Sequence, residues 1–146
     1  MINRRGISKV LTGVRWIYSI FFFLIGAQAL LMYAGILTKS AYPSSPEAKE
    51  FTDAIFATGF IGPIMSMTYF VSGILMIFNR TAPLGLVLLA PFIVVILFTH
   101  LMLNGNPPFG IMMALLWVLF AWRFRNAYQP MWSYRDTTEN NTTNLK

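Results

Sequence analysis

Long uncharged stretches of apolar residues alternate with short polar segments along the chain, and this pattern predicts membrane-spanning helices. A bilayer core of about 30 Å needs about 20 apolar residues as a helix, because each residue rises about 1.5 Å. Four stretches meet or nearly meet this length, over residues 16–37, 54–79, 82–103 and 107–122. The sequence therefore predicts four spans, of which the last is the shortest.

Short connections between these spans predict antiparallel neighbours. The second and third spans are joined through Arg80, and Pro83 fits the first turn of the helix that follows. The third and fourth spans are joined by residues 104–108, which are all Asn, Gly or Pro. We therefore predict an all-α fold, an integral membrane four-helix bundle made of two antiparallel helical hairpins.

The connection over residues 38–53 is long enough to form structure of its own. Ser45, Pro46 and Glu47 are typical of a helix N-terminus, because serine caps the first turn, proline tolerates it, and an acidic side chain is favourable there. We predict a short interfacial helix that leads into the second span.

The distribution of Lys and Arg predicts the orientation of the chain in the membrane. One side of the predicted bundle carries nine positive residues: Arg4, Arg5, Lys9, Arg15, Arg80, Arg123, Arg125, Arg135 and Lys146. The other side has only Lys39 and Lys49, together with three acidic residues. Both termini are therefore predicted to be cytoplasmic. Residues 1–15 form a basic flank, 16–122 the membrane domain, and 123–146 a tail whose polar end from Thr137 is predicted to be disordered.

Composition supports a membrane protein and excludes several chemistries. Apolar types make up 56% of residues and charged types 11%, against about 25% charged in soluble domains. The net charge is +6, but no block of like charge resembles a nucleic-acid-binding arm. With no Cys and one His, the chain has no thiolate metal site and no bis-histidine site of its own. Because no known catalytic motif is present either, we expect no metal, no intrinsic cofactor, no catalytic residue and no self-contained enzyme.

Gln28 and Tyr69 are strongly polar positions within the apolar stretches. Because their spans run in opposite directions, the helical rise places the two side chains at similar depths, within about 6 Å. One interpretation is a polar pocket for a quinone head group or another small ligand. The other is an interhelical hydrogen bond that fixes packing, worth about 0.5–2 kcal/mol, and this is the more common use of such residues.

His100 is the residue of the spans that titrates near neutral pH. Near the outer end of the third span, it could relay a proton to or from a bound quinol. It could instead bind a carbonyl of the following turn or lie at the level of the lipid head groups, and such a structural role is the more common one for a lone histidine.

Small residues recur at every fourth position in the second predicted span, at Ala54, Thr58, Gly62 and Ser66. Such a strip lets another helix approach closely, and it favours packing within the bundle over a homo-oligomer seam. Pro63 beside the strip is expected to bend the helix.

The second hairpin resembles the DoxX family of small bacterial membrane proteins. The resemblance rests on residues 72–80, 82–91 and 96–101, in which Gly, Asn, Arg, Pro, Leu, Ala, Pro and His follow one another in the family's order. It implies a place in the bacterial cytoplasmic membrane, as in subunits of quinone-linked sulfur oxidation and of oxidoreductase complexes in oxidative-stress defence. Arg80 and His100 are the matched polar positions.

The sequence departs from that family at two places. Many members carry an acidic residue on the second span and a Lys on the first, where this chain has Tyr69 and Gln28 or Ala29. The resemblance implies an accessory or anchoring subunit of a quinone-linked redox complex, with a quinone ligand, an oxidoreductase partner, and Gln28, Tyr69, His100 and Arg80 as candidate ligand-binding residues. The alternative is a small binder or transporter of an apolar molecule with no redox role.

Overall fold

The computed structural model describes residues 4–38 and 45–132, and within these ranges the chain is helical with no strand. Its elements are α1 (Arg4–Tyr33), α2 (Pro46–Ala57), α3 (Ile61–Ile77), α4 (Ala82–Phe98), the π-helix η1 (Thr99–Leu103), α5 (Pro107–Arg123) and α6 (Arg125–Trp132). The prediction of an all-α protein is confirmed for these residues. The disordered tail predicted from Thr137 lies outside them.

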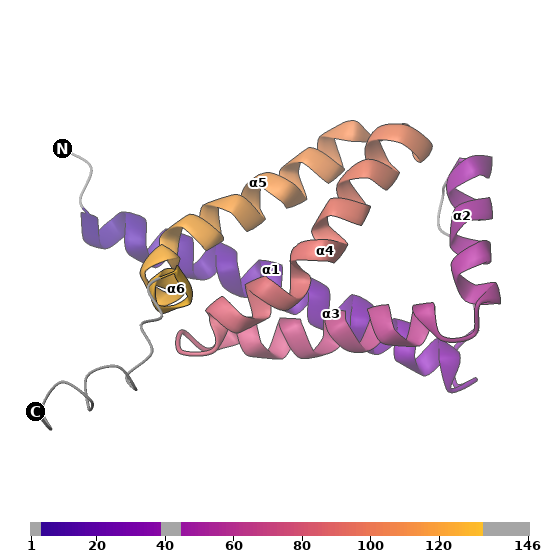
Figure 1. The fold of residues 1–146 in the computed structure, drawn as a ribbon, viewed down its shortest axis with the longest axis horizontal. Helices are drawn as coiled ribbons and strands as arrows, with labels where there is room; N and C mark the ends of the chain where they lie inside the picture. Colours follow the sequence, from indigo (N-terminus) through magenta and orange to yellow (C-terminus); the bar gives the residue numbers. More distant parts are fainter. Residues whose placement is uncertain (1–3, 39–44, 133–146) are drawn as a thin grey trace, which may run out of the picture.

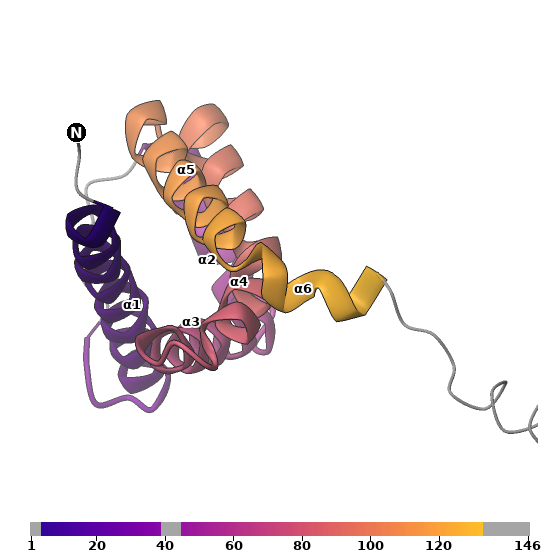
Figure 2. The same cartoon turned by 90° about the vertical axis from the view of Figure 1, so that its left-hand side faces the viewer.

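The four long helices pack in a series, with α1 against α3, α3 against α4, and α4 against α5. The α4–α5 hairpin diverges from the α1–α3 pair, and α2 stands across the open end of the resulting wedge (Figure 1). Viewed from the other end, the four helices form a U whose two arms are α1 and α5 (Figure 2).

Aromatic side chains join the two arms of the U. The Tyr18 ring of α1 packs 5.5 Å from the Phe120 ring of α5 and 4.9 Å from that of Phe22, measured between ring centroids. The Tyr18 hydroxyl donates a hydrogen bond to the Met113 carbonyl at 3.1 Å, and the Trp117 indole donates to the Leu86 carbonyl at 2.9 Å. Phe22 and Phe120 are almost completely buried, so these rings form the centre of the core.

The α1–α3 pair is packed more closely than side chains usually permit. A Cβ at Gly26 would lie 2.8 Å from the Ser66 carbonyl oxygen, and one at Gly73 would lie 2.8 Å from the Phe23 Cα atom. In each case the obstacle is backbone of the facing helix, which cannot move aside alone. Gly26 therefore acts as a contact point between helices and does not interrupt α1.

Two helical stretches, Ser8–Tyr33 and Ala82–Leu103, are long and apolar enough to cross a membrane, and a third would count if the bent pair α2 and α3 is one span. Helix α5 is apolar but has only 17 residues. The first helix begins earlier and ends earlier than the predicted span 16–37. It ends at Tyr33 because Gly35 adopts a positive φ of 73°, which turns the chain away from the helix axis.

The helix expected over residues 54–79 is divided into α2 and α3, whose axes differ by 98°. Gly59 has a φ of 75°, a conformation that favours glycine and ends α2. Pro63 lies in the first turn of α3, where its missing N–H is tolerated, so it belongs to a helix start and not to a bend within a helix. The break also separates Ala54 of the small-residue strip from Gly62 and Ser66, which remain buried on α3.

The side chain of Thr58 holds this corner together. Its hydroxyl donates to the Ile55 carbonyl at 2.7 Å, at the end of α2, and accepts from the Ile61 amide at 3.2 Å, at the start of α3. One hydroxyl therefore links the two helices by bonding the Ile61 amide and the Ile55 carbonyl, which also accepts from the Thr58 amide at 3.3 Å.

We expect Thr58→Val to loosen the corner by about 1–2 kcal/mol, the usual cost of a lost helix cap, because valine keeps the shape but cannot form either hydrogen bond. Amide hydrogen exchange at Ile61 and in the last turn of α2 should become faster. Thr68→Val is the matched control, because the Thr68 hydroxyl donates only to the Ile64 carbonyl within α3. Equal exchange in the two variants would contradict the capping role.

Candidate functional site

A cavity of about 280 Å³ lies at the end of the molecule where α2 crosses the wedge. Residues of α1, α2, α3, α4 and η1 line it, most of them aliphatic or phenylalanine. Its lining residues with polar groups are Tyr33, Thr52, Ser66, Tyr69, Thr99 and His100. An apolar space with a few polar groups is the usual form of a small-molecule site.

Helix α2 forms one wall of the cavity and contacts η1 at its start and α1 near its end. Ser45 caps its first turn, as predicted, by accepting a hydrogen bond from the Ala48 amide at 3.1 Å. The same Ser45 hydroxyl donates to the Leu103 carbonyl at the end of η1. On the other side, the Phe56 ring stacks on the Tyr33 ring of α1, with 4.9 Å between centroids and 16° between planes. The wall is thus anchored to α1 and to η1.

The Tyr33 hydroxyl is a buried group that has no hydrogen-bond partner in the described chain. It lies directly over Gly62 of α3, where a Cβ would collide with it. Leaving such a donor unpaired costs about 1–3 kcal/mol, so an acceptor supplied by a ligand would be favourable. Gly62 therefore gives the tyrosine room to pack its hydroxyl against α3, and both residues line the cavity.

His100 lies in the π-helix η1, and its Nδ1 atom is 2.8 Å from the Ile96 carbonyl oxygen. A carbonyl can only accept a hydrogen bond, so Nδ1 carries the proton and, in the neutral ring, Nε2 keeps the lone pair. The Phe109 ring packs 4.8 Å from the imidazole, centroid to centroid, and restricts its orientation. His100 therefore lines the cavity with an imidazole held by the Ile96 carbonyl and the Phe109 ring, and Nε2 of its neutral form is an acceptor.

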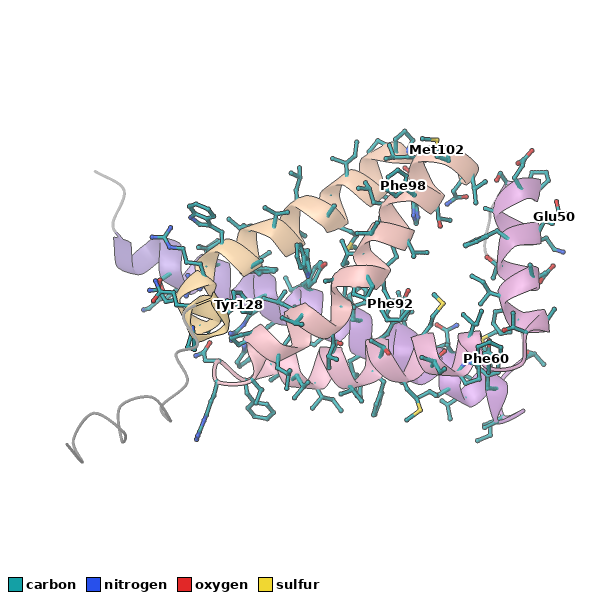
Figure 3. All side chains as sticks on the ribbon, in the orientation of Figure 1. Glu50, Phe60, Phe92, Phe98, Met102 and Tyr128 are labelled. Atoms are coloured by element: carbon teal, nitrogen blue, oxygen red, sulfur yellow. The ribbon has the colours of Figure 1, made fainter. Side chains whose placement is uncertain are left out.

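Tyr69 occupies the inner part of the same cavity. Its side chain is 9% exposed and packs between the Phe22 ring at 5.6 Å and the Phe92 ring at 5.5 Å. Figure 3 shows Phe92 on the side of α4 that faces α3. Aromatic rings from three helices thus close the cavity toward the core.

A second hollow, of about 370 Å³, adjoins the cavity and shares Phe51, Val95 and Thr99 with it. Its lining is otherwise apolar and includes Phe98, the last residue of α4, and Met102 of η1 (Figure 3). The cavity thus carries several polar groups, and the hollow beside it is apolar except for Thr99, which both share.

The structure brings two of the four candidate ligand-binding residues together. Tyr69 and His100 line one cavity, whereas Gln28 and Arg80 do not. Gln28 follows Gly26 by two residues, which is about 200° around α1, so it faces away from the α1–α3 contact and forms no hydrogen bond with Tyr69. Arg80 is exposed in the turn between α3 and α4, at the other end of the molecule.

Tyr33 is a cavity residue that the sequence pattern did not single out, and the same is true of Thr52 and Thr99. A tyrosine near a span end is typical of an anchor at the membrane surface. Its role here depends on Phe56, which reaches it only because α2 turns away from α3. The glycine at position 62 was the available signal, because it provides space at the level of the tyrosine.

No family model, curated protein or solved structure matches the chain. Within residues 4–38 and 45–132, no group of three or more His, Cys, Asp or Glu side chains could hold a metal ion. The polar groups that line the cavity are the hydroxyl side chains of tyrosine, threonine and serine and the imidazole of His100, and the rest of the lining offers aromatic and aliphatic contact.

Proposed function

We propose that this chain is a multi-pass membrane protein that binds an apolar molecule with a hydrogen-bonding head group, of the quinone class. In this proposal it is a DoxX-like accessory subunit of a membrane redox complex. The observation that carries the proposal is the shared cavity of Tyr33, Tyr69 and His100, with the apolar hollow beside it. A quinone has the same two parts, a polar ring and a long apolar tail.

The groups of the cavity match the chemistry of a quinone ring. Its carbonyl oxygens are acceptors, and the unpaired Tyr33 hydroxyl is a donor. After reduction, the ring hydroxyls become donors, and Nε2 of neutral His100 is an acceptor for them. The surrounding phenylalanine rings favour stacking of a flat ring, and the hollow lined by Phe98 and Met102 suits the tail.

The membrane placement belongs to the same proposal. We infer four spans in the bacterial cytoplasmic membrane, with both termini cytoplasmic because nine Lys and Arg lie on that side and two on the other. The cavity then lies toward the outer surface, at the end where α2 crosses. An oxidoreductase partner would bring the redox centre, since the chain itself offers only hydrogen-bonding groups at this site.

The proposal is tested with the full chain in lipid nanodiscs, to which decylubiquinone is added. We expect a concentration-dependent rise in melting temperature, because a ligand that binds only the folded state stabilises it. Decane, which has the same tail without the ring, is the control and should shift the melting temperature less. No shift with either compound would refute the proposal, and equal shifts would favour a binder or transporter of apolar molecules with no redox role.

A further inference from the structure

At the end of the molecule opposite the cavity, the positively charged side chain of Arg15 is buried, and its hydrogen-bonding groups are only partly paired. The residue is 3% exposed, and its Nη2 atom donates to the Ile77 carbonyl at 3.2 Å, at the end of α3. Its guanidinium carbon lies 5.7 Å from the centre of the Phe124 ring. The Nε atom is buried and has no hydrogen-bond partner in the described structure. A buried charge of this kind is costly unless an anion pairs with it.

A second arginine reaches the same face of α1. The Nη2 atom of Arg123, at the end of α5, donates to the Ser8 hydroxyl at 3.3 Å. Ser8 and Arg15 are seven residues apart, which is two helical turns, so they share one face of α1. Arg15 also packs against the ring of Phe124, the residue that follows Arg123, so the two arginines lie near each other. Arg123 is exposed, so a ligand can reach the two arginines from the side on which Arg123 lies.

The carboxylates that the structure describes are far from this pair. The chain has five acidic residues, and the three within the described ranges are Glu47, Glu50 and Asp53, all on α2. Asp53 forms an ion pair with Lys49 at 3.0 Å. Figure 1 shows α2 at the end of the molecule opposite α6 and the start of α1. The two arginines thus lack a carboxylate partner among residues 4–38 and 45–132.

We propose that the phosphate of an anionic phospholipid binds between Arg15 and Arg123. A guanidinium group matches a phosphate through paired N–H donors, and basic sites between membrane helices recognise lipid head groups in this way. The phosphate oxygens accept from the exposed Arg123, and the charge of the phosphate compensates the neighbouring buried Arg15 guanidinium. The site lies where α3 and α5 end and α4 begins, which is the level of the head groups in the proposed placement. The inference rests on that placement and is independent of quinone binding.

The test compares nanodiscs of phosphatidylcholine with nanodiscs that also contain a minor fraction of phosphatidylglycerol. Native mass spectrometry of the full chain should show phosphatidylglycerol retained over the bulk ratio by about tenfold, the size expected for one charge-assisted hydrogen bond. Arg123→Gln should reduce the retention to near the bulk ratio. Because Arg123 is exposed, this variant should fold even where Arg15→Gln does not.

Arg125→Gln is the charge-matched control, since Arg125 lies two residues away with its guanidinium 4.9 Å from the centre of the Trp122 ring. Equal loss of retention in both variants, or none in Arg123→Gln, would overturn the proposal. In phosphatidylcholine nanodiscs, inorganic phosphate should stabilise the protein less than phosphatidylglycerol does. Equal stabilisation would show that the bound phosphate group need not come from a lipid, and would overturn the lipid proposal. If neutralising Asp136 and Glu139 destabilised the protein in phosphatidylcholine, the counter-charge would belong to the tail, and the lipid site would be refuted.

Discussion

Gly26→Ala is expected to destabilise the folded protein by about 3 kcal/mol, as overpacking of a tight contact does. The added methyl group would lie 2.8 Å from the Ser66 carbonyl oxygen and would also meet backbone atoms of Phe70. Because the obstacle is backbone, α1 and α3 must separate along part of their length. Gly73→Ala should behave alike, since its methyl group would meet the backbone of Phe23.

Gly13→Ala is the matched control for this prediction. Gly13 lies in the same helix, and a Cβ there would meet nothing within 4 Å. Alanine should therefore stabilise α1 slightly, by up to about 1 kcal/mol, through its better helix propensity. Unfolding by titration with a denaturing detergent, followed by tryptophan fluorescence, measures all three variants. Similar stabilities for the Gly13 and Gly26 variants would show that α1 and α3 are not closely packed.

The double variant Tyr33→Phe with His100→Leu is expected to weaken binding of the reduced quinone, the quinol, by about a hundredfold. Each substitution removes one hydrogen bond to the ring, which costs about tenfold in a site shielded from water. The two losses should add, because the groups come from separate elements, α1 and η1. Titration of the nanodisc-embedded variants with decylubiquinol, kept reduced, measures the dissociation constants, whereas with decylubiquinone only the loss of about tenfold from Tyr33→Phe is expected.

Stability in the absence of ligand separates this effect from simple damage to the fold. Tyr33→Phe removes a buried hydroxyl that has no partner, so the empty protein should become more stable by about 1 kcal/mol while it binds quinone less tightly. Tyr128→Phe is the control, because the Tyr128 hydroxyl donates to the Pro83 carbonyl at 3.2 Å, at the far end of the molecule. Unchanged affinity in Tyr33→Phe would remove this tyrosine from the proposed site.

Much of the helix pattern could be predicted because it depends on local properties. The start of α2 follows from Ser45 and Pro46, which form the expected cap and first turn. The helical stretch 82–103 coincides with the predicted third span, although its last five residues form a π-helix. Pro83 lies in the first turn of α4, as predicted.

The candidate site could be predicted only in part. Tyr69 and His100 were recognised because polar residues in apolar stretches are conspicuous. The pairing of Tyr69 with Gln28 was inferred from depth along the helices, but depth does not specify the direction in which a side chain points. The face of α1 that meets α3 is set by Gly26, and Gln28 lies on another face.

By itself, the sequence determined an all-helical chain, apolar enough for helices to cross a membrane, with turns at Asn, Gly and Pro residues. These properties follow from the length of apolar stretches and from backbone preferences, which act locally. Only the tertiary structure decided that α2 turns 98° away from α3, that Tyr33 meets Phe56, and that a cavity remains beneath them. These features depend on which helix faces pack together, and that is set by contacts between residues far apart in the chain.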